Sequence, residues 1–377
     1  MNPTMFILVA ALAAQTPPAP APTPTPDPLA GWTLSGTFEG YYEWNANQPT
    51  DRVNSLRAYD TRANTFSIQQ VALVLESAPD RSASRPFGLR VDLQFGQATD
   101  TVQGSPANEP RPDVYRNVWQ AYGSYVFPGT HAVRMDFGKF GSSLGFETNY
   151  AKDNINFSRA LLFDFLPFYH NGLRLQVPVG DKVSLSYMLT NGVQQTEDFN
   201  NFKSSQFMAV LTPVKSVTWT VNYYTGQEQP DHGAADGPDG WFHVFDTYVT
   251  YAPTAKASFA ADVNHTVNQV HASDAFGALI GFSGYARYQV TRPVAVATRY
   301  EYLNDDGGLF GGVKQVLQEI TVTLEHKLAD GFLVRGEFRG DWSDRAYFPV
   351  HDGTVNTRQN TWLVGLVWWM GGKSGAW

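Results

Sequence analysis

Apolar and polar side chains alternate along most of the chain, from Trp32 to Met370. In Phe87–Gly96 the odd positions are apolar, and the even positions hold glycine, arginine, aspartate or glutamine. The stretch 332–342 repeats this pattern with four charged side chains on one parity. Successive side chains of a strand point to opposite faces, so each such stretch predicts a strand with one apolar and one polar face.

These stretches predict an all-β protein, specifically a transmembrane antiparallel barrel with the strands in up-and-down meander order. A soluble sandwich would bury its apolar faces and usually has shorter strands, whereas a barrel turns its apolar face to lipid and its polar face to a wet lumen. Marking each alternating stretch gives about sixteen strands, an even number as such barrels require. The predicted strands are 32–44, 64–76, 85–99, 114–126, 131–140, 170–179, 182–191, 206–213, 216–228, 241–252, 256–266, 276–290, 294–304, 317–328, 331–341 and 360–370.

The predicted connections alternate between tight turns and long loops. Tight turns rich in Gly, Pro and Asp include 127–130 and 328–331, whereas 45–63, 229–240 and 345–359 are long and polar. Bacterial outer-membrane barrels have short periplasmic turns and longer external loops. Both chain ends are therefore expected on the periplasmic side. The longest insertion, 141–171, is the third external loop of this scheme.

The N-terminus has the features of an export signal. Residues 5–14 form a short apolar run with small residues at its end, so 1–14 is expected to be a signal peptide, although no Lys or Arg precedes the run. A disordered apolar tail is the alternative. The proline-rich stretch 15–31 cannot join a strand ladder and is expected to be a periplasmic linker before a barrel spanning 32–377.

Composition excludes several other classes of protein. The chain has no cysteine and no apolar run of about 18 residues, which excludes a disulfide scaffold and makes a helical membrane protein improbable. Its formal net charge of -8 argues against a nucleic-acid partner. The eight histidines are scattered, and no phosphate-binding loop or metal-ligand spacing occurs, so no cofactor is expected.

Several segments near the longest insertion resemble one known family. Residues 136–147, 153–159 and 167–175, together with 335–348 near the C-terminus, resemble the putative β-barrel porin-2 family, the OmpL-like porins. The resemblance implies a Gram-negative outer-membrane porin that passes small hydrophilic solutes or ions by passive diffusion. In sixteen-stranded porins the third external loop folds into the lumen and narrows it, so the insertion, at about 141–169, is expected to do the same. An ordinary extracellular loop is the alternative.

Strand parity selects the charged side chains that face the lumen. They could set the field across a water-filled pore. They could equally brace the wall as cross-strand ion pairs. The expected pore-lining residues are Arg90, Asp92, Arg134, Asp136, Arg174, Arg299, Glu301, Arg335, Glu337, Arg339 and Asp341. In the inward-folded loop, the apolar stretch 160–168 is expected to pack on the wall while Glu147, Lys152, Asp153 and Arg159 stay wet and form the constriction.

Other interpretations remain beside the channel. An outer-membrane enzyme of the acyl hydrolase or transferase type would need a histidine and a nucleophile, and His170 lies near Ser158 in the sequence without a placed acid partner. A surface-binding barrel could use the Asp- and Gly-rich stretch 226–240. The expected partners are outer-membrane lipid, small hydrophilic solutes, the barrel-insertion machinery and, in a homotrimer, further copies of the chain. Either Trp369 or Trp377 could be the terminal insertion signal.

Overall fold

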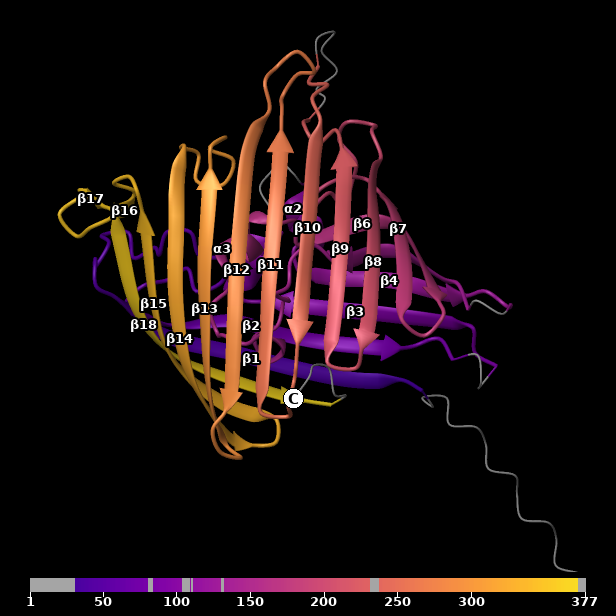
Figure 1. The fold of residues 1–377 in the computed structure, drawn as a ribbon, viewed down its shortest axis with the longest axis horizontal. Helices are drawn as coiled ribbons and strands as arrows, with labels where there is room; N and C mark the ends of the chain where they lie inside the picture. The colour runs from indigo at the N-terminus through magenta and orange to yellow at the C-terminus, as the bar shows by residue number, and fades with distance from the viewer. Residues whose placement is uncertain are drawn as a thin grey trace, which may run out of the picture. The chain divides into compact units, whose positions relative to one another are not determined.

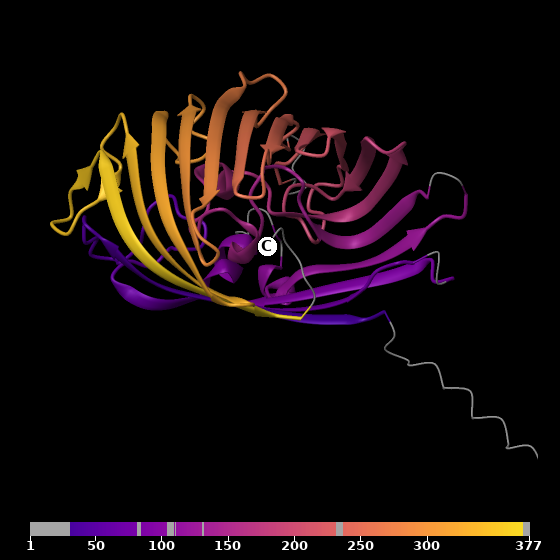
Figure 2. The ribbon, with the colours of Figure 1, turned by 60° about the horizontal axis from the view of Figure 1, so that its bottom comes forward.

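Sixteen antiparallel strands close into one barrel in sequence order, with the first strand paired to the last (Figures 1 and 2). The computed structural model describes residues 31–80, 84–103, 109, 111–129, 132–230 and 237–371. The barrel strands are β1 (Thr33–Asn45), β2 (Thr65–Ser77), β3 (Phe87–Phe95), β4 (Val118–Val126), β5 (Arg134–Gly141), β6 (Tyr169–Val179), β7 (Val183–Thr190), β8 (Ser204–Val214), β9 (Val217–Gly226), β10 (Phe242–Tyr251), β11 (Ala257–Asn268), β12 (Gly277–Gln289), β13 (Val294–Asp305), β14 (Gln315–Ala329), β15 (Phe332–Ser343) and β18 (Arg358–Met370). The prediction of an all-β meander barrel is confirmed.

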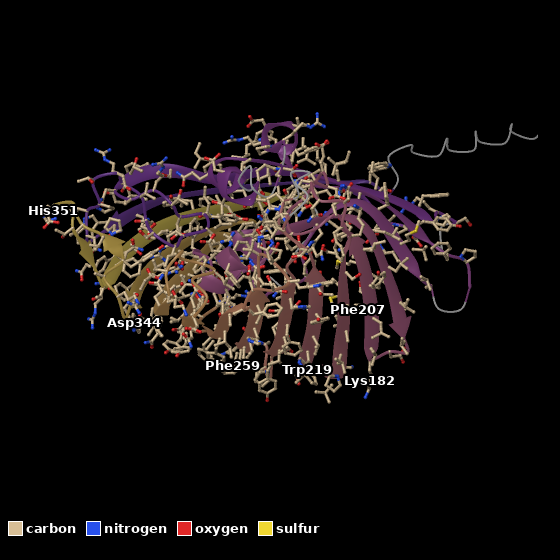
Figure 3. The ribbon with its side chains drawn as sticks, turned by 90° about the horizontal axis from the view of Figure 1, so that it is seen from above. Lys182, Phe207, Trp219, Phe259, Asp344 and His351 are labelled. Atoms are coloured by element: carbon tan, nitrogen blue, oxygen red, sulfur yellow. The ribbon has the colours of Figure 1, made fainter. Side chains whose placement is uncertain are left out.

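The two parities of each strand face two different environments. Phe207, Trp219 and Phe259 are exposed on the outer surface, and Figure 3 shows Trp219 and Phe259 projecting from the ribbon. The side chains at the alternate positions of the strands are buried and mostly polar. The strands β13 and β14 show this alternation of buried and exposed positions clearly. An exposed apolar belt around a polar interior is the surface that a barrel presents to lipid.

Short turns and long loops collect at opposite ends of the barrel. The turns 180–182, 215–216, 252–256, 290–293 and 330–331 lie at the end where β1 begins and β18 finishes, which we call the turn end. The long connections lie at the other end, the loop end. Among the described residues, no helix is long and apolar enough to cross a membrane. The expected signal peptide and most of the expected linker fall outside the described residues, as does Trp377.

The sequence prediction of the strands needed correction at two places. The strand predicted over 85–99 ends at Phe95, because α1 (Gln97–Val102) follows it, and the strand predicted from 114 begins at Val118, after α2 (Pro112–Tyr115). A small hairpin, β16 (Phe348–Pro349) with β17 (Val355–Asn356), was not predicted within the last long loop. The remaining barrel strands begin and end within three residues of the predicted bounds.

Loop three, residues 142–168, connects β5 to β6 and contains the 3-10 helix η1 (Ala151–Asp153) and the helix α3 (Leu161–Phe165). Its apolar side chains pack on the inner face of the wall. Leu161 and Leu162 join a cluster with Leu303 and Leu317, and Phe157 packs near Tyr41. Loop three therefore contacts the inner face of the wall through its apolar side chains.

One glycine of the wall makes this packing possible. Gly365 on β18 lies under the ring of Phe157, where an added Cβ would overlap the aromatic carbons. A larger residue would push Phe157 and the adjoining loop away from the wall. The barrel interior around β18 is therefore shaped to accept loop three.

Candidate functional site

Carboxylates on the barrel wall accept hydrogen bonds from the backbone amides of loop three. Glu301 on β13 accepts from the N–H groups of Leu161 and Leu162 at 2.6 and 3.2 Å. Glu337 on β15 accepts from those of Phe157 and Ser158 at 2.8 and 3.0 Å. Each carboxylate uses both of its oxygens on consecutive amides, which fixes the direction as well as the position of the loop backbone.

Carboxylates on other strands extend the same pattern to the first half of the loop. Asp246 on β10 accepts from Gly145 N–H at 3.0 Å, and Asp262 on β11 accepts from Phe146 N–H at 2.9 Å. On β1, Glu39 accepts from the N–H of Ala151 at 2.6 Å. The loop is thus attached to the wall from β10 through β15 and on to β1, so it crosses the lumen.

Arg335 on β15 binds the carbonyl groups of the loop. Its guanidinium donates to the carbonyl oxygens of Ala151, Asn154 and Asn156 at 2.7 to 2.9 Å. The same guanidinium donates twice to Glu325 on β14, at 3.0 and 2.8 Å. The planar fork of arginine allows this many directed bonds from one side chain, which the ammonium of a lysine could not make.

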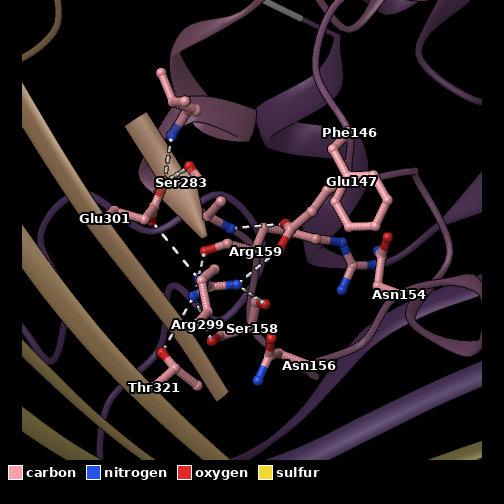
Figure 4. Close-up of polar contacts among 12 residues, drawn as sticks. Phe146, Glu147, Asn154, Asn156, Ser158, Arg159, Ser283, Arg299, Glu301 and Thr321 are labelled. Carbon is pink, nitrogen blue, oxygen red and sulfur yellow. Dashed lines mark hydrogen bonds and ion pairs between the residues drawn. The ribbon is translucent and has the colours of Figure 1, made fainter. Parts of the chain in front are cut away.

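Arg299 on β13 is the centre of a second buried network (Figure 4). It donates to Glu147 of the loop at 2.8 Å and to the carbonyl oxygen of Ser158 at 2.8 Å. On the wall it is paired with Glu319 at 2.8 Å and lies 3.7 Å from Glu301. The side chain of Arg299 is fully buried, so its charge is balanced by the surrounding carboxylates instead of by water.

Arg339 on β15 completes the clamp. Its guanidinium pairs with Asp341 at 2.8 Å and with Glu319 at 3.0 Å, and it donates to the carbonyl oxygen of Arg159 at 2.5 Å. Arg159 itself lies over the ring of Tyr59 and 3.6 Å from Glu39. We refer to Arg299, Arg335, Arg339 and the wall carboxylates that they and the loop amides contact as the clamp.

The sequence predicts that the inward-facing charged side chains contact water in the pore, and on one side of the barrel this prediction is wrong. The residues there face inward as parity predicts, but each is at most 5% exposed, and they act as braces of the wall or of the loop. They are Arg299, Glu301, Arg335, Glu337, Arg339 and Asp341. Loop three covers most of them, whereas Asp341 is paired with Arg57 of the loop between β1 and β2 at 2.7 Å. The residues of loop three expected to stay wet are also largely covered: Glu147, Lys152 and Arg159 are buried, and Asp153, 13% exposed in its side chain, pairs with Lys152.

The other side of the barrel, from β3 to β6, carries charged side chains that loop three covers less completely, with Tyr150 of the loop donating to Asp92 at 3.2 Å. Arg90 on β3 is paired with Asp92 at 2.9 Å and with Glu76 of β2 at 3.3 Å. Asp136 on β5 is shared by two arginines of the same wall, Arg134 and Arg174, each at 2.7 Å. The three arginines of this wall keep part of their side-chain surface exposed.

A cavity of about 300 Å³ lies between loop three and this less covered wall. Arg90, Gln120 and Trp119 line it from the wall, Phe146 and Asp153 line it from the loop, and Tyr248 lines it from β10. Polar and aromatic side chains therefore surround the space that the loop leaves inside the barrel.

The helix α3 carries a carboxyl group with altered acidity. The pKa of Asp164 is raised to about 7, chiefly by burial and also by the nearby carboxylate of Asp60, although Arg339 and Arg57 oppose the shift. Asp164 therefore binds a proton more tightly in the folded protein than in an unfolded chain.

Two further residues with a titratable side chain, Lys139 and His170, are buried in the structure. Lys139 follows Gly138, whose φ is +133°, and is buried, with its Nζ 3.8 Å above the ring of Tyr169 and 3.4 Å from Gln103 Oε1. The imidazole of His170 contacts Ser142 Oγ at 3.2 Å and the carbonyl oxygen of Gly192, not Ser158. In the described part of the chain, no three His, Cys, Asp or Glu side chains are grouped to hold a metal ion.

Sequence reasoning missed several residues of the clamp. The inward parity of their strands was the available signal. The missed residues are Glu39, Asp246, Asp262, Glu319 and Glu325.

The chain belongs to the family described as putative beta-barrel porin-2, OmpL-like, whose members it matches over residues 31–368. It is therefore an outer-membrane porin. No curated protein matches the chain.

Solved outer-membrane proteins share the fold at low sequence identity. The channel DcaP of Acinetobacter baumannii superposes with a TM-score of 0.58 at 11% identity, covering 90% of this chain and 98% of that one. OmpT of Vibrio cholerae gives 0.57 at 11% identity, covering 90% and 97%. OmpF of Salmonella typhi, solved with daunomycin, gives 0.57 at 12% identity, covering 90% and 97%. At such identities the likeness concerns the fold alone.

Proposed function

We propose that this porin passes small hydrophilic solutes or ions by passive diffusion, and that loop three sets the width of the path. The observation that carries the proposal is the position of the loop. It lies inside the barrel, is fastened to one wall by the clamp, and leaves a cavity lined by polar and aromatic side chains against the other wall. A water-filled path with a fixed narrow point would select solutes by size and charge.

Passive diffusion needs no catalytic group, and the features of the site favour a channel over an enzyme. The one histidine discussed as a base, His170, is buried against a backbone carbonyl and Ser142. Its surroundings resemble those of a structural histidine, because no acidic group among its hydrogen-bond partners orients the ring.

Orientation and assembly are part of the same proposal. Both ends of the barrel sheet lie at the turn end, which we assign to the periplasm because short turns face that side in bacterial outer-membrane barrels. A homotrimer fits the exposed apolar outer surface, and one solved form of Vibrio cholerae OmpT is described as a trimer.

The test is single-channel recording from the refolded protein in a planar bilayer. Stable ohmic steps at both signs of voltage are expected, together with uptake of small sugars into liposomes that contain the protein. Insertion is checked independently by the change in gel mobility between unheated and boiled samples. A folded, inserted barrel without conductance would contradict the proposal and would favour an enzyme or a surface-binding barrel.

A further inference from the structure

On the less covered wall, the arginine side chains lie nearest the lumen and the carboxylates that pair with them lie behind. The side chains of Arg134 and Arg174 are 30% and 14% exposed, whereas that of Asp136 between them is fully buried. Arg90 is 21% exposed and its partner Asp92 is fully buried. Both groups therefore present positive charge to the lumen and keep their negative charge behind it.

Hydrogen bonding explains why Asp136 contributes so little to the lumen. It accepts from Arg134 Nε, from Ser124 Oγ and from both Nε and Nη2 of Arg174, at 2.6 to 2.9 Å. Both carboxylate oxygens are used, so neither is available to a cation in the path. Two guanidinium groups share this one carboxylate, which leaves a net positive charge on the wall.

The neighbouring wall does not offset that charge. Strands β7, β8 and β9 contain no Lys, Arg, Asp or Glu at all. On the next two strands, Asp246 and Asp262 are buried and bonded to the loop backbone. Among the carboxylates paired with the three arginines, Glu76 is the exposed one, at 33% of its side chain.

We propose that the path beside Arg90, Arg134 and Arg174 prefers small anions, such as chloride and short carboxylates, over cations of similar size. This preference is opposite in sign to the formal net charge of -8 of the whole chain, because most carboxylates are buried or lie in loops away from the path. Asp153 of loop three lines the cavity, but Lys152 pairs with it at 2.7 Å and balances its charge. The inference rests on the proposed channel function and adds the class of solute to it.

The test is the reversal potential of the refolded protein in a potassium chloride gradient. The unchanged protein should show a potential of the sign given by chloride selectivity. Arg134→Gln should lower the chloride-to-potassium permeability ratio by roughly two- to fourfold, since one unit charge close to the path is removed. Asp136 keeps Arg174 and Ser124 as partners in this variant, so the strand pairing is preserved.

A second variant changes the ratio in the opposite direction. Glu76→Gln removes the exposed carboxylate and should raise the chloride-to-potassium ratio. Lys203→Gln serves as the control, because it also removes one positive charge. Lys203 lies in an exposed loop away from this wall, where it pairs with Asp198. If Lys203→Gln lowered the ratio as much as Arg134→Gln does, the preference would depend on the overall charge of the protein, and the inference would be overturned.

The outcomes separate this inference from the proposed function. An inserted barrel without conductance would remove the channel, and the anion preference with it. A conducting barrel that prefers potassium, or one whose ratio is unchanged in both Arg134→Gln and Glu76→Gln, would leave the channel in place and overturn only the anion preference.

Discussion

At the scale of single residues, position on the inner face and contact with water are separate properties. Parity alone placed Arg335 and Arg134 in the same class, and both do face inward. Arg335 is buried under loop three, whereas Arg134 keeps 30% of its side chain exposed. The difference arises from a loop distant in the sequence, so alternation within a strand could not reveal it.

Replacing Arg335 tests the clamp. Arg335→Gln removes three bonds to loop carbonyls and leaves Glu325 with Arg287 as its remaining partner. Breaking a buried ion pair from one side costs about 3–5 kcal/mol, so the urea midpoint of unfolding in detergent should fall clearly. The matched control is Arg116→Gln, an exposed loop residue paired with Asp100, for which a change of at most about 1 kcal/mol is expected. Equal effects of the two substitutions would contradict a structural clamp.

The carboxyl group of Asp164 predicts a pH dependence. Its pKa is about 7 in the folded protein against an ordinary value of 3.8, so the folded state binds more protons than the unfolded state between these values. Stability should therefore fall as pH rises from about 4 to 7, by on the order of 1 kcal/mol for this partly exposed group. Urea midpoints at pH 5 and pH 8 measure the change, and Asp164→Asn should flatten it. A slope that persists in Asp164→Asn would assign the pH dependence to other groups.

At the scale of elements, alternation predicted the strands well where both neighbours are strands and less well where a loop forms short helices. The strand predicted up to 99 ends at Phe95, where the odd positions change from apolar to polar at Gln97, Thr99 and Thr101, and the chain turns into α1 at Gln97. Gly96 has a φ of +103°, and its backbone leaves the ladder there. The inward course of loop three was expected from its place as the third external loop and from its apolar stretch. Its attachment to the wall depends on contacts between residues more than a hundred positions apart, which the sequence does not reveal.

Removing most of loop three should widen the path. Deletion of residues 142–165, closed by a short linker, takes away the loop that occupies the lumen, so conductance should rise several-fold if the loop sets the width. A deletion of residues 272–275, in the exposed loop between β11 and β12, is the control and should leave conductance unchanged. Unchanged conductance after the first deletion, in a barrel shown to be folded by its gel mobility, would mean that the narrow point lies elsewhere.

At the scale of the whole molecule, the barrel separates charges in a way that composition cannot show. The excess of acidic residues in the sequence is spread over loops, the clamp and the less covered wall. Carboxylates that accept backbone amides or share arginines have little influence on a solute in the lumen. The sign of the field in the path therefore depends on which side chains remain exposed, and this is a property of the closed barrel with its loop in place.

The orientation of the barrel follows from the same whole-molecule arrangement and can be tested with single cysteines. The chain has no cysteine, so each introduced thiol is the only one present. Ser273→Cys lies in an exposed loop at the loop end, and Asp181→Cys lies in the exposed turn between β6 and β7 at the turn end. If the turn end faces the periplasm, a membrane-impermeant maleimide too large for the pore should label Ser273→Cys on intact cells. It should label Asp181→Cys only after the outer membrane is opened. The reverse pattern would place the long loops in the periplasm and would contradict the assignment of the turn end to that side.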